Sequence, residues 1–323
     1  MGVLSGTQLR HLADEGYLVV EDVFDPVRDL QPLIAEYDDV LDGIATALHA
    51  EGVIGSAYRD LSFYDRLIQV YAESGRNFIR HFDISLPQSG IRHDTPVHLG
   101  PAVFELLTHP RLLDAIEDVI GPEIYASPVQ HIRMKLPKRA IAAQHRNDGL
   151  ISDIPWHQDN GQILPEADDT VVLTVWIAVT DATPENGCLQ VVPRSHRGDV
   201  VTHCPGINGL SIPEQLFAAR QAVPLPMRAG SILLLHRRII HASLPNVTED
   251  QVRLSFDLRY QPIGQPTGRP AFPGFIARSA AHPESVVRDP AAWAQAWYDT
   301  RSRLADKESP NVERWQAGVG VCA

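Results

Sequence analysis

Hydrophobic residues recur at helical spacing through the first third of the chain. Residues 5–16 show the pattern at its clearest, because a hydroxyl residue, Ser5, stands at the start and a glycine, Gly16, at the end. Four such segments predict helices: 5–16, 26–50, 58–82 and 101–120, the last interrupted at His109-Pro110. Residues 17–20 predict a short strand between the first two. We therefore expect residues 1–122 to form a mostly helical N-terminal part.

From residue 123 onward the pattern changes to short runs of β-branched and aromatic residues separated by turn residues. Five runs predict strands: 124–134, 170–179, 188–193, 230–235 and 252–260. No helical pattern lies between them that could connect parallel strands, so we expect an antiparallel sandwich or barrel over residues 123–263. Residues 264–323 then form a C-terminal extension with a helix over 290–315. We expect one domain over residues 1–323.

The last predicted strand has two chemically different faces. Even positions from 254 to 260 are apolar, whereas Arg253, Ser255, Asp257 and Arg259 occupy the odd positions. Side chains alternate between the faces of a strand, so we expect the odd residues to face a cavity and the even ones to face a core. An internal ion pair between Asp257 and Arg259 is an equally good interpretation of that pair.

Composition and charge narrow the classes of function. The 323 residues carry a formal net charge of -12, which argues against a nucleic-acid partner because no basic stripe is present to neutralise phosphates. The start shows no secretory signal pattern, and no apolar run is long enough to cross a bilayer, so no membrane partner is expected. The three cysteines show no CxxC spacing. We expect a reduced, cytoplasmic protein without disulfides; monomer and homodimer are not distinguished.

The candidate chemistry centres on Trp156-His157-Gln158-Asp159. His157 and Asp159 are two residues apart, so on an extended segment both point the same way and can share a metal ion. His241 is the expected third ligand, with His236 and His196 as competitors. Two histidines and one carboxylate on one face of an octahedral ion are typical of non-heme Fe(II) oxygenases. The second HxD pair, His81-Phe82-Asp83, lies in a helical pattern and is interpreted as surface.

Three segments together resemble the phytanoyl-CoA dioxygenase (PhyH) family of Fe(II)/2-oxoglutarate-dependent oxygenases. They are residues 156–159, residues 185–196 (ENGCLQVVPRSH), and residues 229–253 with His241-Ala242-Ser243 and Arg253. The resemblance runs from about Ser5 to about Ile263 and implies a double-stranded β-helix, or jelly-roll, core of the cupin-like kind. It also implies a 2-oxoglutarate-dependent dioxygenase that uses O2 and releases succinate and CO2, with ascorbate as a reductant in vitro.

The resemblance assigns roles to individual residues. His157, Asp159 and His241 would bind Fe(II), and Arg253 would pair with the distal carboxylate of 2-oxoglutarate. Ser243 resembles the hydroxyl that assists this arginine, and Trp176 resembles a residue that lines the cosubstrate pocket. The family's lysine on the first core strand corresponds to Lys135, although strand alternation could equally place Arg133 or neither in the pocket. The separation of twelve residues between His241 and Arg253 requires a bulge or a longer turn.

The substrate is the least determined feature. The polar residues expected around the open coordination face are Gln130, Arg133, His145, Asn160, Gln162 and Arg259. They suit a small polar metabolite or natural-product intermediate, hydroxylated at an unactivated C–H bond. Desaturation, cyclisation or endoperoxide formation with the same cofactors is an alternative. Two further alternatives are a cupin-like hydrolase or isomerase and a noncatalytic small-molecule-binding barrel. Neither would consume 2-oxoglutarate, whereas an oxygenase would.

Overall fold

The computed structural model describes residues 2–206, 209–310, 314–315 and 320–322. The α-helices are α1 (Gly6–Glu15), α2 (Gln31–Ala50), α3 (Phe63–Ser74), α4 (Pro101–Leu107), α5 (Pro110–Ile120) and α6 (Pro290–Leu304). The first six strands are β1 (Tyr17–Val20), β2 (Ile124–Ala126), β3 (His131–Lys135), β4 (Leu173–Ala178), β5 (Leu189–Val191) and β6 (Cys204–Gly206). The others are β7 (Gly209–Ser211), β8 (Val223–Leu225), β9 (Ile232–His236), β10 (His241–Ser243), β11 (Arg253–Pro262) and β12 (Phe275–Arg278).

The helices begin and end where local chemistry directs. Ser5 caps α1 in a reciprocal capping box with Gln8, and Gly16 ends the helix in the left-handed region at φ 87°. Pro110 occupies the first turn of α5, which separates α5 from α4 at the predicted interruption. The predicted helix over 58–82 is shorter, because Gly75 ends α3 at φ 59° and only a single 3-10 turn follows, at Ile79–His81.

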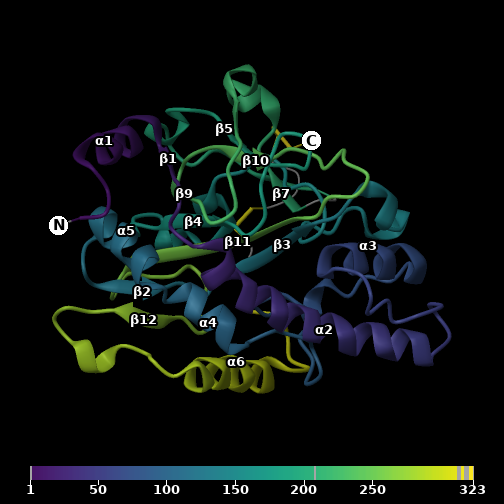
Figure 1. Cartoon of the computed structure of the whole chain (residues 1–323). Helices are drawn as coiled ribbons and strands as arrows, with labels where there is room; N and C mark the ends of the chain where they lie inside the picture. Colours follow the sequence, from purple (N-terminus) through teal and green to yellow (C-terminus); the bar gives the residue numbers. More distant parts are fainter. Residues whose placement is uncertain (1, 207–208, 311–313, 316–319, 323) are drawn as a thin grey trace.

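Two antiparallel sheets form the centre of the molecule (Figure 1). The larger has the order β1-β9-β4-β11-β2-β12, with β3 also paired to β11, and the smaller has the order β10-β5-β8. An isolated antiparallel bridge between His157 and His241 extends the smaller sheet. The helices α2, α4 and α6 lie on one side of the larger sheet, opposite β5 and β10. This is the mainly β architecture with flanking helices that the sequence predicts.

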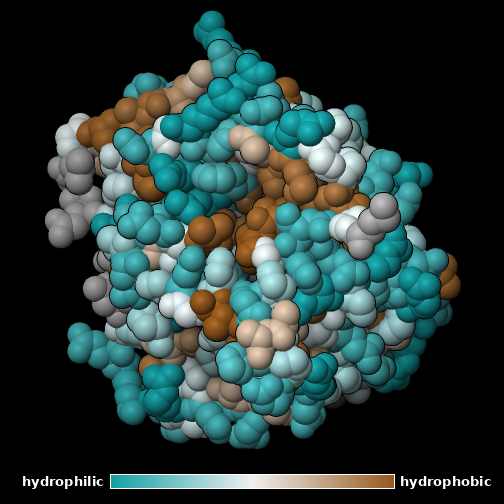
Figure 2. Space-filling view, turned by 90° about the vertical axis from the view of Figure 1, so that its left-hand side faces the viewer, coloured by the Kyte–Doolittle hydropathy of each residue, from teal (hydrophilic) through white to brown (hydrophobic). Residues whose placement is uncertain are grey.

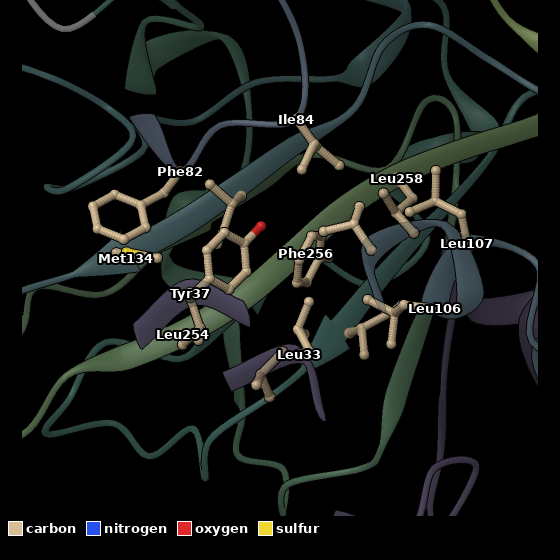
Figure 3. Packing of buried hydrophobic residues seen from close by; sticks show 14 of the residues in the cluster. Leu33, Tyr37, Phe82, Ile84, Leu106, Leu107, Met134, Leu254, Phe256 and Leu258 are labelled. Atoms are coloured by element: carbon tan, nitrogen blue, oxygen red, sulfur yellow. The ribbon is translucent and has the colours of Figure 1, made fainter. Parts of the chain in front are cut away.

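Strand β11 separates the hydrophobic core from the polar interior. Leu254, Phe256 and Leu258 point toward the helices and pack with Leu33 and Tyr37 of α2, among others (Figure 3). Every residue from Arg253 to Gln261 is buried, so the odd, polar positions are enclosed on the opposite face of the strand. The predicted alternation of faces is confirmed, and of the four odd residues expected to face a cavity Arg259 lines one. Its polar face contributes to the site described below.

Two predictions about the C-terminal extension are wrong. Helix α6 ends at Leu304 and not near residue 315, although part of the predicted length, 311–313, lies outside the described residues. Cys204 and Cys322 form a disulfide across a sequence separation of 118, whereas the sequence predicted none. An odd number of cysteines does not exclude a disulfide, because two of the three can pair and leave one free thiol. The free thiol is Cys188, which is buried. The chain path, which the sequence pattern does not show, brings the other two together.

The face of the molecule on the side of α1 and α5 is hollowed and lined in part by hydrophobic residues (Figure 2). A cavity of about 350 Å³ lies there, lined among others by Leu9, Leu12, Val119 and Val172. No helix among the described residues is long and apolar enough to cross a membrane.

Candidate active site

Three side chains that could hold a metal ion converge between the two sheets. One ligand atom from each of His157, Asp159 and His241 lies within 4.8 Å of the others, and all three residues are buried. The two histidines face each other across their backbone bridge, with both N–H to O distances at 3.0 Å. The residue between His157 and Asp159, Gln158, is extended and donates its side-chain amide to Arg238 O at 2.7 Å. That arrangement leaves His157 and Asp159 on the same side, as predicted.

Both histidines are held with one nitrogen free for a metal. The Nδ1 of His157 donates to Pro155 O at 2.8 Å, and the Nδ1 of His241 donates to Ile239 O at 3.1 Å. A proton fixed on Nδ1 leaves the lone pair on Nε2, which is the form that ligates metals. Burial, followed by the neighbouring His241, lowers the pKa of His157 to about 3, so its imidazole is neutral at physiological pH.

Asp159 is oriented by two donors. Arg259 Nη2 lies 2.5 Å from Asp159 Oδ1, and the Thr174 hydroxyl donates to Oδ2. Burial alone would raise the pKa of Asp159, but Arg259 and the two histidines hold it below its usual value. Arg259 also pairs with Asp257 at 3.1 Å, which is the internal ion pair considered for that strand. Two imidazoles whose Nε2 atoms face the site and an ionised carboxylate form a donor set that fits a divalent transition metal.

A second group of charges lies at the start of β11. Lys135 is the register partner of Arg253, and both are buried. Lys135 Nζ donates to Ser243 Oγ at 2.7 Å and to Leu244 O, and it pairs with Asp153 at 3.1 Å. Ser243 therefore contacts the lysine, although the resemblance places this hydroxyl beside the arginine.

Arg253 donates its hydrogen bonds to uncharged groups. It donates to Gly187 O at 3.1 Å and to Ser255 Oγ at 2.6 Å, and its guanidinium lies 5.3 Å from the ring centroid of Trp176. No carboxylate of the described residues lies within ion-pairing distance of it. Burial lowers the pKa of Arg253 to about 10 and that of Lys135 to about 7, and in each case a nearby cation adds to the effect.

A cavity of about 410 Å³ opens onto the three candidate metal ligands, with His157 and Arg259 in its wall. Among the described residues, the wall carries four arginines and a single acidic residue, Asp148; the arginines are Arg80, Arg133, Arg259 and Arg269. Its apolar part includes Leu86, Val129, Leu150, Ile154 and Leu210. The cavity therefore combines guanidinium groups with a hydrophobic surface.

The residues predicted to contact the substrate divide into two groups. Arg133, Gln162 and Arg259 line the cavity. Gln130 and Asn160 are buried and donate to the backbone carbonyls of Ile84 and Asp168. His145 does not line this cavity.

The sequence patterns did not indicate two buried polar residues near the site, Asp83 and His203. Asp83 is buried and contacts His131 Nδ1 at 3.2 Å and Arg80 at 3.0 Å, so the surface interpretation of the second HxD pair is wrong for the aspartate. His203 is also buried, and its Nε2 accepts a hydrogen bond at 2.9 Å from the backbone N–H of Gln158, the residue between the candidate ligands His157 and Asp159. His203 lies in a segment without a strand pattern, so no signal pointed to it.

Comparison with known proteins gives one family and several relatives. The family model described as Phytanoyl-CoA dioxygenase (PhyH) matches residues 12–255. Phytanoyl-CoA dioxygenase domain-containing protein 1 of Danio rerio is 23% identical over 261 residues, which cover 77% of this chain and 87% of the relative. The 1-deoxypentalenic acid 11-beta-hydroxylase of Streptomyces arenae is 28% identical over 175 residues, or 51% of this chain and 58% of the relative.

Among solved structures, the apo form of the non-heme monooxygenase ThoJ is similar to this chain. Its TM-score is 0.59 at 20% sequence identity, and the match covers 92% of this chain and 95% of that chain. A likeness at this level of identity concerns the fold. Together with the two antiparallel sheets it confirms the predicted jelly-roll core.

Proposed function

The chain belongs to the phytanoyl-CoA dioxygenase family and is a 2-oxoglutarate-dependent dioxygenase, and we propose that it hydroxylates an unactivated C–H bond of a small anionic metabolite. His157, Asp159 and His241 would be the ligands of Fe(II). Oxidative decarboxylation of 2-oxoglutarate to succinate and CO2, with transfer of one oxygen atom of O2 to the substrate, is the chemistry that a ferrous ion in this ligand set supplies.

The observation that carries the proposal is the guanidinium of Arg253, which is buried without a carboxylate partner among the described residues. A buried charge is costly unless it is paired, so an unpaired arginine favours an anionic ligand at this position. The distal carboxylate of 2-oxoglutarate can accept two parallel hydrogen bonds from a guanidinium. Lys135 lies opposite in the register and would add a second cation. A hydrolase or isomerase on the same fold has no use for either.

The cavity supports an acidic substrate with a hydrocarbon body. The acidic partners of Arg80, Arg133 and Arg259 are the buried residues Asp83, Asp257 and Asp159, whereas the three guanidinium groups line the cavity. In a protein of net charge -12, such a wall attracts anions locally. A volume of about 410 Å³ suits a small molecule and not a polymer. The Streptomyces arenae relative, whose name gives an acid as its substrate, is consistent with this class.

Two measurements test the proposal. Anaerobic titration of Fe(II)-loaded protein with 2-oxoglutarate is expected to show saturable binding in the wild type, loss of binding in Arg253→Ala, and no change in His93→Ala, whose side chain is exposed. Incubation with metabolite extracts, Fe(II), 2-oxoglutarate and ascorbate is expected to give an acidic product that has gained one oxygen, together with succinate, and His157→Ala should give neither. Absence of 2-oxoglutarate binding in the wild type would exclude the oxygenase. A product that has only lost two hydrogens would replace hydroxylation by desaturation.

A further inference from the structure

Two side chains of the C-terminal tail contact the short helical turn that begins at Asp159. Arg314 Nη1 donates to Asn160 O at 3.1 Å, and Trp315 Nε1 donates to Gly161 O at 2.7 Å. Both carbonyls belong to the 3-10 turn Asp159–Gln162. The family model ends at residue 255, so these contacts come from a part of the chain outside the matched region.

Each of the two tail residues has a second anchor near the same turn. Arg314 Nη2 pairs with Asp168 Oδ2 at 2.9 Å, and the Asn160 side chain donates to Asp168 O at 3.1 Å. The Trp315 ring stacks on His203 with centroids 5.4 Å apart and an interplanar angle of 23°. The turn is therefore contacted by Arg314, which is anchored on Asp168, and by Trp315, which is stacked on His203.

The disulfide ties the tail to the same place. Cys204 follows His203 directly and begins β6, and its bond to Cys322 joins that strand to the end of the chain. The partner strand β7 contributes Gly209 and Leu210 to the cavity wall. A covalent link at this position limits how far the tail can move from the turn.

We propose that Arg314 and Trp315 are positioning residues for the candidate metal ligand Asp159, and that the disulfide keeps them in place. A 3-10 turn has poor hydrogen-bond geometry and is rarely stable by itself. Its carbonyls at 160 and 161 are fixed by the tail, so the direction of the Asp159 side chain depends on contacts made about 150 residues further along the chain. This inference rests on the proposed function.

Cobalt(II) binding tests the proposal with a readout that does not require turnover. The dissociation constant and the visible absorption spectrum of the bound cobalt are measured for full-length variants well below their unfolding temperatures. Arg314→Ala is expected to raise the dissociation constant about 10-fold and to shift the spectrum, as loss of an outer partner of a metal ligand does. Trp315→Phe, which keeps the ring and removes the N–H donor, is expected to raise it about 3-fold. Arg314→Lys should recover part of the affinity.

The disulfide is removed by substitution, because thiol reductants themselves bind divalent cations. Cys204→Ser, Cys322→Ser and the double variant are expected to weaken cobalt binding by the same factor as one another. Arg303→Ala is the matched control, since Arg303 also donates to a backbone carbonyl, Ala271 O at 2.6 Å, but lies on α6 away from the turn. It should leave affinity and spectrum unchanged.

The outcomes separate the two proposals. Cobalt affinity in Arg314→Ala and Trp315→Phe equal to that of the wild type would overturn the positioning role and leave the proposed function intact. A wild-type protein that binds no cobalt would overturn both. A fall in unfolding temperature in Arg314→Ala with unchanged cobalt spectrum and affinity would mean that the tail only stabilises the fold, and this too would overturn the positioning role.

Discussion

Replacement of Arg253 by methionine is expected to cost the protein at most about 3 kcal/mol of unfolding free energy while abolishing its response to 2-oxoglutarate. Burial lowers the pKa of Arg253 from 12.5 to about 10. Below pH 10 the arginine is charged in both the folded and the unfolded chain, so the whole shift counts against folding, about 3 kcal/mol at 1.36 kcal/mol per pKa unit. Methionine is shorter but has a similar volume and no charge, so it removes that cost.

The gain is offset by lost hydrogen bonds. Gly187 O and Ser255 Oγ lose their donor, at about 1 to 3 kcal/mol for each buried group left without a partner. The two groups together cost about 2 to 6 kcal/mol against a gain of about 3, so the net change in the free energy of unfolding is expected to lie between a gain of about 1 and a loss of about 3 kcal/mol. With 2-oxoglutarate at 100 times its dissociation constant, the wild type gains about 2.7 kcal/mol and the variant gains nothing.

Urea unfolding of the metal-loaded protein, with and without 2-oxoglutarate, measures both quantities. Arg66→Met is the matched control: Arg66 is as deeply buried, but it pairs with Asp42 at 2.5 Å and donates to Ala57 O at 2.8 Å. The Arg66→Met variant should lose about 2 kcal/mol of unfolding free energy both with and without 2-oxoglutarate. It should still be stabilised by 2-oxoglutarate as the wild type is. The reasoning about Arg253 is refuted if its methionine variant loses more than about 3 kcal/mol of unfolding free energy without ligand, or is still stabilised by 2-oxoglutarate.

Three further predictions follow from the structure. Lys135 has a pKa of about 7 in place of 10.5, so above pH 7 its amine must take up a proton before it can pair with a carboxylate. The affinity for 2-oxoglutarate should therefore fall as the pH rises from about 7 to 9. Calorimetric titration of Lys135→Met with 2-oxoglutarate should show an affinity that depends less on pH. Phe256→Ala should lower the free energy of unfolding in urea by about 3 to 5 kcal/mol and leave the cobalt dissociation constant of the folded protein unchanged, because the ring packs on the helical side of β11. Arg259→Lys should raise the cobalt dissociation constant by about 10- to 100-fold, because a lysine cannot reproduce the guanidinium contacts to Asp159 and Asp257. A cobalt affinity equal to that of the wild type would show that Asp159 is oriented without Arg259.

The parts of the fold and site that depend on local periodicity were predictable. Strand alternation assigned each residue of β11 to its face, because the period of two leaves no freedom once one face is hydrophobic. The same argument placed His157 and Asp159 on one side of Gln158. The apolar spacing over 58–82 predicts one long helix and hence a surface position for Asp83, whereas Gly75 ends α3 in the left-handed region, a stop that this spacing does not indicate.

The contacts made by the tail were not predictable in this way. Arg314 and Asn160 are separated by 154 residues, and no pattern in either segment indicates the other. The same holds for the disulfide, whose two cysteines have no characteristic spacing. Only the path of the chain around the smaller sheet brings these groups together, and that path is set by the packing of the whole core.

The charges on the inner face of the larger sheet explain why the site depends on ligands for balance. Arg133, Lys135, Arg253 and Arg259 lie there with three carboxylates, Asp153, Asp159 and Asp257, so the cations exceed the carboxylates by one when Lys135 is protonated and before any metal binds. A divalent cation increases that excess, whereas the dianion 2-oxoglutarate reduces it. Binding of either should therefore favour binding of the other, since coupling between two sites is reciprocal. An acidic substrate extends the same compensation to the cavity, which is the electrostatic reason for preferring it.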